Sequence, residues 1–210
     1  GFKGSAVSGM PGIPLLMSDS ELSKVQLRNE LRQRRQALSP EAQLAAAQAA
    51  VTFIQQLPDW PGAQRIALYL AADGEIDTTE LAALGRSQGK QLFLPVIEQD
   101  DHLSFAAWLP GSPLAVNRYG IPEPPEDAKR CATDTLDIIF LPLVGWDLQG
   151  GRLGMGGGFY DRTLAGVSGP VLVGLAHSKQ QVDCIPREDW DIPLNFIATD
   201  TALYFCQGAN

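Results

Sequence analysis

The chain has 210 residues, of which 45% are hydrophobic, and this length is sufficient to bury the core of one globular domain. Its net charge of −8 excludes general nucleic-acid binding, which needs a basic surface, but leaves room for a local cationic pocket. No long apolar run occurs, so neither a transmembrane helix nor a membrane partner is expected. Cys131, Cys184 and Cys206 lie far apart and predict reduced, buried thiols in a cytoplasmic protein.

Residues 1–19 are rich in Gly, Ser and Pro and are predicted to be a disordered segment or an expression tag. Met17 is a candidate native start within this segment. Residues 20–206 contain no internal repeat and no linker-like stretch, and we therefore predict one domain there.

The first helix is predicted to begin at the capping-box sequence Ser18-Asp-Ser-Glu21 and to run to about Leu38. We expect its apolar residues to face the core: Leu22, Val25 and Leu31. Four basic residues share another face, at spacings of four, four and three: Lys24, Arg28, Arg32 and Arg35. Taken alone, this pattern favours a solvated basic face. Ser39-Pro40 predicts a second helix start, with the helix ending near Leu57.

The remaining chain alternates between apolar segments and helical patterns. Strands are predicted over residues 65–70, 91–97, 103–108, 138–143, 170–176, 196–199 and 202–205, and helices over 78–86 and 158–165. The Pro-rich residues 110–125 are expected to be irregular. This order predicts an α/β, Rossmann-like domain with a mainly parallel sheet and helices on both faces. Ligands bind beyond the carboxyl ends of such strands, which places the segments after Leu70 and Val144 at the site.

A glycine-rich loop follows the late apolar run of residues 137–144. Seven of the fourteen residues from Gly145 to Gly158 are glycine, which allows the backbone to approach a ligand closely. Exposed N–H groups in such a loop form an anion-binding concavity, and Arg152 adds a cation suited to phosphate. Asp161 offers a hard oxygen to Mg²⁺. These residue types predict a nucleoside triphosphate site.

The alternative interpretation is that the loop is only a flexible connection, because loops are generally rich in glycine. It has neither the Gly-Lys-Ser/Thr of a Walker A motif nor the G-x-G-x-x-G spacing of a dinucleotide fold. Phosphate binding is therefore a chemical inference, and the pattern does not identify the nucleotide.

The segment Arg152-Leu-Gly-Met-Gly-Gly-Gly-Phe-Tyr-Asp-Arg162 resembles the signature of the 5-formyltetrahydrofolate cyclo-ligase family. The resemblance extends from about Ser20 to Thr199 and includes further elements: Lys24-Val-Gln-Leu-Arg28, Glu75-Ile-Asp-Thr78, Tyr119-Gly-Ile-Pro-Glu-Pro124, Ile185-Pro186 and Asp191-Ile-Pro193. One position departs from the pattern, since many members carry lysine where this chain has Gly157. The departure removes a possible cation for phosphate or substrate.

This resemblance implies an ATP- and Mg²⁺-dependent ligase that closes a ring. 5-Formyltetrahydrofolate, with or without a polyglutamate tail, would become 5,10-methenyltetrahydrofolate, with release of ADP and phosphate. Transfer of the γ-phosphoryl group to the formyl oxygen would make that oxygen a good leaving group before N10 attacks. We also expect a cytoplasmic monomer that binds no nucleic acid.

The resemblance further assigns roles to individual residues. The expected ATP-binding residues are Lys24, Arg28, Arg152, Leu153, Gly154, Met155, Gly156, Gly157, Gly158, Phe159 and Tyr160. The expected catalytic residues are Arg152 and Asp161, and the expected metal ligands are Asp161 and Asp191. The expected substrate-binding residues are Glu75, Asp77, Trp108 and Tyr119.

Each acidic assignment has a structural alternative. Asp161 is also compatible with a helix start or an ion pair with Arg162, and Asp191 with a turn before Pro193. Glu75 and Asp77 are compatible with a turn and with a cap for the following helix.

The aromatic assignments have an alternative too, because Phe159, Tyr160, Trp108 and Tyr119 are of a type more often found in a core. No base is assigned to His177, which follows a predicted strand, and His102 is expected to be exposed.

Two other classes of function remain open from the residues. A sugar-phosphate isomerase or CoA-transferase-like enzyme on a related fold would bind phosphate at the loop without needing ATP. A non-catalytic folate or nucleotide binder is favoured by the absence of lysine at Gly157.

Overall fold

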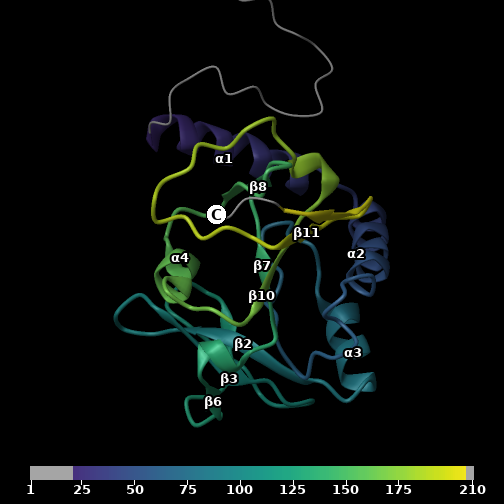
Figure 1. The fold of residues 1–210 in the computed structure, drawn as a ribbon, viewed down its shortest axis with the longest axis vertical. Helices are drawn as coiled ribbons and strands as arrows, with labels where there is room; N and C mark the ends of the chain where they lie inside the picture. Colours follow the sequence, from purple (N-terminus) through teal and green to yellow (C-terminus); the bar gives the residue numbers. More distant parts are fainter. Residues whose placement is uncertain (1–20, 207–210) are drawn as a thin grey trace, which may run out of the picture.

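The computed structural model describes residues 21–206, and it is organised around an eight-stranded sheet with the order β12-β11-β10-β7-β1-β2-β3-β6 (Figure 1). Five adjacent strands, from β11 to β2 in that order, are mutually parallel, and the strands at both edges are antiparallel. The bounds of the strands in this sheet are β1 Arg65–Ala67, β2 Gln91–Ile97, β3 Leu103–Ala107, β6 Arg130–Cys131, β7 Ile138–Pro142, β10 Val171–Leu175, β11 Phe196–Ala198 and β12 Leu203–Phe205. The predicted mainly parallel sheet is confirmed.

The chain changes direction across this sheet between β1 and β7. From β1 it proceeds to β2 on one side, and from β7 it proceeds to β10 and then β11 on the other. Right-handed crossovers that run in opposite directions place their helices on opposite faces of the sheet. They also separate the two connections at the carboxyl ends of β1 and β7, where ligands bind in open α/β sheets.

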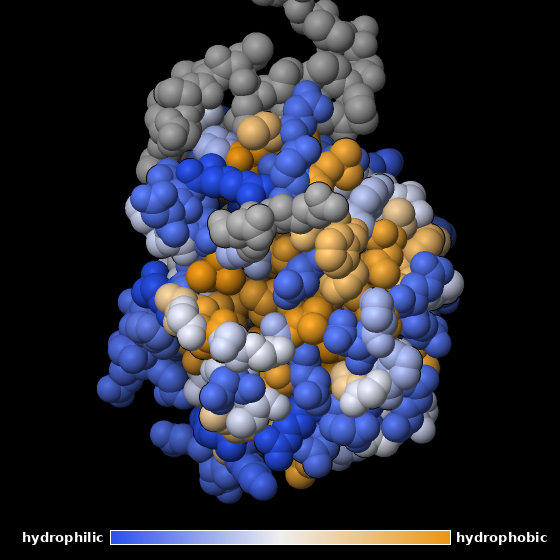
Figure 2. Space-filling model, in the orientation of Figure 1, coloured by the Kyte–Doolittle hydropathy of each residue, from blue (hydrophilic) through white to orange (hydrophobic). Residues whose placement is uncertain are grey.

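Alternate residues of the strands build a core on each face of the sheet. Ile66, Ile138 and Phe140 pack on one side, whereas Ala67 and Ile139 pack on the other, as expected for a pleated strand. The first side is covered by α2 (Pro40–Ile54) and α3 (Thr79–Ser87), and the second by α4 (Phe159–Leu164). Figure 1 shows α2 and α3 on one side of the central strands and α4 on the other. Figure 2 shows apolar residues gathered over the central strands, with polar residues around much of the periphery.

The helix starts follow the local chemistry of the sequence. The hydroxyl of Ser39 accepts a hydrogen bond from the Ala42 N–H at 3.1 Å, and Pro40 occupies the first turn of α2, as predicted. The helix α1 (Glu21–Gln36) also forms as predicted, although Ser18 lies outside the described residues.

The helix α1 lies across the carboxyl ends of the strands. Leu27 and Leu31 are buried against Val144 and Leu153, and Figure 1 shows α1 beside β8. The expectation that Val25 faces the core is wrong, because this side chain is 46% exposed. The Leu22 side chain lies outside the described part of the structure.

The interpretation of a solvated basic face on α1 is also wrong. The Lys24 and Arg35 side chains are buried, and Arg32 forms an ion pair with Asp73 at 2.6 Å. The amphipathic pattern did not distinguish a helix surrounded by solvent from one whose polar face closes a pocket.

Part of the glycine-rich segment forms a β-hairpin, whereas the sequence predicted a loop throughout. A hairpin forms between β8 (Gly145–Trp146) and β9 (Arg152–Leu153), and the buried Asp147 carboxylate accepts hydrogen bonds from the N–H groups of Gly151 and Ile185, both at 2.9 Å. A second hairpin, β4 (Ala115–Val116) with β5 (Pro122–Glu123), lies within the Pro-rich segment predicted to be irregular.

The prediction of reduced, buried thiols is confirmed only in part. The three thiols form no disulfide; Cys206 is buried and Cys131 half-buried, but Cys184 is exposed, so the expectation of buried thiols is wrong there. Within residues 21–206, no helix combines the length and apolar character needed to cross a membrane.

The tight contact between β10 and the β7 connection predicts a stability effect at Gly174. A Cβ atom there would lie 2.5 Å from Leu143 Cδ1 and 2.9 Å from Leu194 Cδ1. Gly174→Ala is therefore expected to lower the free energy of unfolding by about 1–3 kcal/mol through overpacking. Urea unfolding measures this effect, with Gly62→Ala as the control because no atom lies within 4 Å of its added Cβ. Equal stability of the two variants would contradict the packing described.

Candidate active site

A cavity of about 580 Å³ lies where the connections after β1 and β7 diverge. Tyr69 and Glu75 follow β1, and Leu143 and Val144 follow β7, so the segments expected from the sheet topology do line it. Every residue from Arg152 to Asp161 also lines it. The cavity has a polar end formed by α1 and the glycine segment, and an apolar end formed by β2, β3 and α4.

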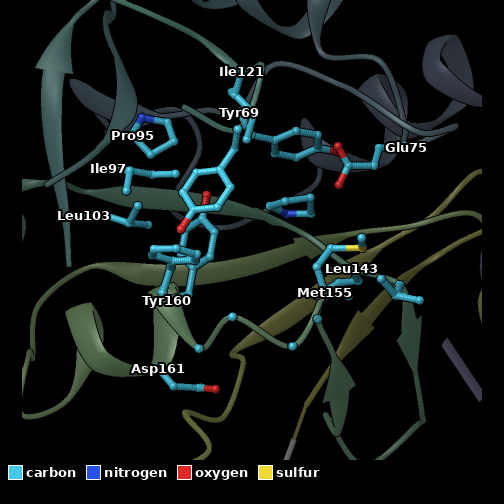
Figure 3. A pocket seen from close by; sticks show the side chains of 18 of the residues that line it. Tyr69, Glu75, Pro95, Ile97, Leu103, Ile121, Leu143, Met155, Tyr160 and Asp161 are labelled. Carbon is cyan, nitrogen blue, oxygen red and sulfur yellow. The ribbon is translucent and has the colours of Figure 1, made fainter. Parts of the chain in front are cut away.

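The apolar end is a chamber with few polar groups. Its walls include Pro95 and Ile97 from β2, Leu103 from β3 and Ile121 from the β4–β5 hairpin. Figure 3 shows Glu75 on the opposite side of the chamber from Pro95, Ile97 and Leu103. Such a chamber fits a flat, largely apolar ligand that has a few hydrogen-bonding groups.

Burial perturbs two of the polar groups of this chamber, Glu75 and Tyr160. Burial raises the pKa of the Glu75 carboxyl, whose Oε1 accepts a hydrogen bond from the Ala72 N–H at 2.9 Å. Burial, followed by the nearby Glu75, raises the pKa of the Tyr160 hydroxyl, which therefore stays protonated at neutral pH. A neutral hydroxyl and a carboxylate can orient a ligand that has both donors and acceptors.

Tyr160 and Asp161 begin α4 but point to different parts of the site. In Figure 3 the Tyr160 side chain points toward the apolar chamber, whereas Asp161 points away from it. The expectation that Tyr160 contacts the nucleotide is thus less well supported by the geometry than a contact with the ligand of the chamber.

At the polar end, Arg152 is paired with Asp161. The guanidinium donates from Nη2 to Asp161 Oδ1 and from Nε to the Ile192 carbonyl at 3.2 Å. Asp161 Oδ1 also accepts the Ile192 N–H at 3.0 Å. The alternative of an ion pair between Asp161 and Arg162 is wrong, because Arg162 donates to the Asp101 carbonyl instead.

The basic residues of α1 reach the same end. Lys24 forms an ion pair with Glu188 at 3.3 Å, and Arg28 donates from Nε to the Gly154 carbonyl at 2.8 Å. Both line the cavity, together with Arg152. Residues distant in the sequence thus place three cationic side chains around the glycine segment.

The glycine segment depends on the absence of side chains at two positions. Gly156 has a φ of +99°, and an added Cβ there would lie 3.2 Å from Arg28 Cζ. At Gly157 an added Cβ would lie 2.7 Å from the Phe159 ring. A lysine at Gly157 would therefore require the Phe159 ring to move.

The two aspartates expected to bind metal both line the cavity. Asp191 Oδ2 accepts the Glu188 N–H at 2.8 Å, so the turn role considered for this residue is present. Among the described residues, no group of three or more His, Cys, Asp or Glu side chains has the arrangement of a metal site. Each aspartate nevertheless keeps one oxygen without a hydrogen-bond partner in the described chain.

Two expected substrate contacts lie outside the cavity lining. Asp77 Oδ1 accepts the Thr79 N–H at 2.7 Å in the turn before α3, whose N-cap is Thr78 without a side-chain cap. Trp108 packs against the core and lies under the Arg86 guanidinium, 4.3 Å from the ring centroid. The alternative of a core aromatic is therefore the role observed for Trp108, and Asp77 has a turn role next to the helix start. The sequence does not show which way β3 and α3 face, and it therefore could not show that Asp77 and Trp108 lie outside the cavity lining.

The β4–β5 hairpin forms one wall of the cavity. The Glu123 carboxylate accepts the Ile97 N–H at 2.7 Å and the Asn117 amide at 3.0 Å, which fixes the hairpin to β2. Its turn presents Tyr119, 54% exposed, whose ring meets the Phe159 ring edge-on at 5.9 Å. The Gly-Ile-x-Glu-Pro element of the sequence lies in this hairpin. The sequence did not indicate, however, that Tyr119 contacts Phe159.

The histidines do not contribute to the cavity. His177 is buried, and burial lowers its pKa, while Nε2 lies 3.0 Å from the Gly74 carbonyl. His102 is exposed, as expected. This agrees with leaving the role of general base unassigned.

A cation-lined glycine segment beside an apolar chamber, at the switch point of a parallel sheet, is typical of the ligand sites of α/β enzymes. The model of the 5-formyltetrahydrofolate cyclo-ligase family matches residues 20–200, and the chain belongs to that family.

Relatives and solved structures support this membership. The chain is 41% identical over 174 residues to the 5-formyltetrahydrofolate cyclo-ligase of Haemophilus influenzae, covering 80% of this chain and 93% of the relative. It is 40% identical to the enzyme of the same name from Escherichia coli K12, covering 83% and 98%. The 5,10-methenyltetrahydrofolate synthetase of Aquifex aeolicus superposes with a TM-score of 0.77 at 31% identity, covering 89% and 94%.

Proposed function

We propose that this chain is an ATP- and Mg²⁺-dependent 5-formyltetrahydrofolate cyclo-ligase that produces 5,10-methenyltetrahydrofolate, ADP and phosphate. The observation that carries the proposal is one continuous cavity, with cations and glycine backbone at one end and an apolar chamber at the other. The triphosphate of ATP is highly charged, whereas the ring system of a reduced folate is flat and largely apolar. The two ends of the cavity therefore match the two ligands. Family membership and the named relatives add support.

The chain's own residues would act mainly by positioning and by neutralising charge. Lys24, Arg28 and Arg152 would hold the phosphates, the γ-phosphoryl group would pass to the formyl oxygen, and N10 would then attack the formyl carbon. Phosphate leaves with its bridging oxygen, and N10 loses its proton. Glu75 and Tyr160 would orient the folate in the chamber.

Mg²⁺ would neutralise the phosphate oxygens when bound. Asp161 and Asp191 fit a site of this kind, because magnesium sites on nucleotides commonly use one or two carboxylates with phosphate and water as the other ligands. To bind a phosphate, Arg152 would exchange its contact with Asp161 for the ligand, and the carboxylate would then be available to the cation.

Three further predictions complete the proposal: the division into residues 1–19 and a domain over 20–206, a monomeric state, and a cytoplasmic location. A folate with a polyglutamate tail would extend out of the cavity past the exposed rim that includes Tyr119 and Trp190. We propose no nucleic-acid or membrane partner.

The decisive experiment incubates the purified protein with 5-formyltetrahydrofolate, with and without Mg-ATP. We expect absorbance of the methenyl product only when Mg-ATP is present, with one ADP formed per product. Product without ATP would favour a different reaction class. Thermal stabilisation by both ligands without product would favour a non-catalytic binder.

Asp161→Asn tests the metal assignment. Removing the carboxylate charge is expected to raise the Mg²⁺ concentration needed for half-maximal rate by at least about tenfold. The measurement is a Mg²⁺ titration at saturating ATP, with circular dichroism to verify folding. If Asp161 only holds Arg152, the Michaelis constant for ATP will rise and the Mg²⁺ requirement will stay unchanged, which would remove Asp161 from the metal site.

Tyr119→Ala tests the contribution of the hairpin to folate binding. Loss of the exposed ring that contacts Phe159 is expected to raise the Michaelis constant for the folate about fivefold to tenfold, because an aromatic contact is lost. Steady-state kinetics with the folate varied measures this. Trp108→Phe is the matched control and should leave that constant unchanged, since Trp108 does not line the cavity. The reverse pattern would refute the geometry.

A further inference from the structure

The side chain of Arg35 is completely buried although it carries a charge that no acid within its own helix neutralises. It lies near the end of α1, on the face that also carries Lys24 and Arg28. Arg35 does not line the cavity. A buried guanidinium is costly unless its donors are satisfied, so its contacts reveal what it holds.

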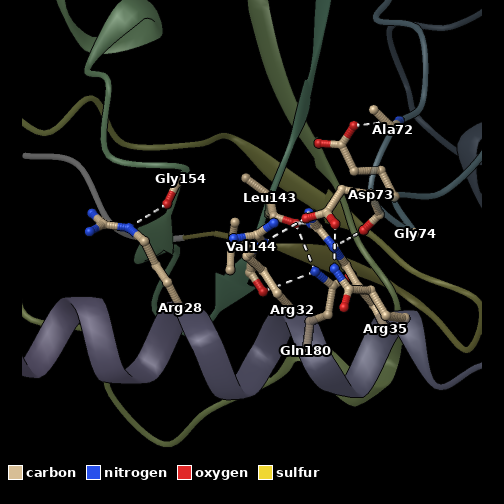
Figure 4. Close-up of polar contacts among 12 residues, drawn as sticks. Arg28, Arg32, Arg35, Ala72, Asp73, Gly74, Leu143, Val144, Gly154 and Gln180 are labelled. Carbon is tan, nitrogen blue, oxygen red and sulfur yellow. Dashed lines mark hydrogen bonds and ion pairs between the residues drawn. The ribbon is translucent and has the colours of Figure 1, made fainter.

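Three of its hydrogen bonds go to two different segments of the cavity wall. Nε donates to the Asp73 carbonyl at 2.6 Å, Nη2 to Asp73 Oδ2 at 2.9 Å, and Nη1 to the Leu143 carbonyl at 3.1 Å. Figure 4 shows Arg32 and Arg35 pointing from α1 toward these segments, whereas Arg28 points to the Gly154 carbonyl of the glycine segment. Arg35 thus joins α1, the turn after β1 and the end of β7.

The turn after β1 is built to receive this contact. Asp73 has a φ of +55°, and its carboxylate also accepts from Arg32 at 2.6 Å and from Gln36. The hydrogen bonds from Arg32 and Arg35 hold the pKa of Asp73 at about 2, so it stays ionised. In the same turn, Glu75 bonds back to Ala72, and Gly74 packs against Arg35. Moving Asp73 therefore moves Glu75.

The end of β7 is held from a second side. Gln180, which is fully buried, donates to the Leu143 carbonyl at 2.7 Å and to the Val144 carbonyl at 2.9 Å. Val144 leads directly into the β8–β9 hairpin and the glycine segment. Arg35 and Gln180 therefore share one carbonyl at the origin of the phosphate end of the cavity.

We propose that Arg35 is a positioning residue that fixes the nucleotide end of the cavity relative to its folate end. Its contacts set the distance between Lys24 and Arg28 on α1, Glu75 after β1 and the segment after β7. Phosphoryl transfer needs both ligands in one arrangement, and small displacements of either are costly. This inference deepens the proposed function and rests on it.

Arg35→Lys is the test, because lysine keeps the charge but does not reach Asp73 and Leu143 together. We expect kcat/KM to fall about tenfold to a hundredfold for both Mg-ATP and 5-formyltetrahydrofolate, with both Michaelis constants raised. A role in folding alone would reduce the amount of active enzyme and leave both Michaelis constants at wild-type values, which would overturn the proposal.

Two further variants make the outcome unambiguous. Asp73→Asn keeps the shape and tolerates the positive φ, and it should reproduce the rise in both constants even if Arg35→Lys folds poorly. Arg34→Lys is the matched control, because Arg34 donates at the surface to the Lys179 carbonyl, outside the cavity. It should behave as wild type.

A binding measurement separates this inference from the proposed function. Calorimetric titration with Mg-ATP alone should show weaker binding to Arg35→Lys than to wild type. Absence of turnover by wild type would end the proposed function but leave this comparison decisive. Equal ATP affinity of wild type and Arg35→Lys would end the role of Arg35.

Discussion

The divergence of the connections after β1 and β7 is the constraint on which the rest of the molecule depends. Two adjacent parallel strands whose crossovers run in opposite directions cannot close the space beyond their carboxyl ends. Three segments that line the cavity surround that opening: the turn with Glu75, the glycine segment that follows Val144, and α1, which lies across both. The cavity is thus a consequence of the strand order, and the side chains adapt it to its ligands.

An opening of this kind leaves backbone groups at the strand ends that need partners, because buried carbonyls are rarely left unsatisfied. Arg35 and Gln180 meet that need at Leu143, and Arg35 also meets it at Asp73. The same hydrogen bonds that satisfy the fold therefore determine the shape of the site. In this protein, stability at the switch point and the geometry of the ligand pocket are not separable.

The glycine segment illustrates how a local signal acquires its meaning from distant residues. Gly156 accommodates the Arg28 guanidinium, and Gly157 accommodates the Phe159 ring, which in turn contacts Tyr119 of the β4–β5 hairpin. The space beside Gly157 is thus filled by an aromatic ring from the same chain. The three cationic side chains around this segment, Lys24, Arg28 and Arg152, come from two separate elements, α1 and β9.

The sequence by itself determined the helices and the central strands and their order, but not the two hairpins, because hydrophobic period, capping at Ser39 and apolar strands are local properties. It also identified the glycine segment through a long ordered motif. Tertiary structure alone decided which polar residues belong to the site. Asp77 and Trp108 lie outside the cavity lining, whereas Lys24 and Arg28 from the basic face of α1 line it. The physical reason is that the orientation of a charged or aromatic side chain depends on which elements pack beside it, and that packing is a property of the whole fold.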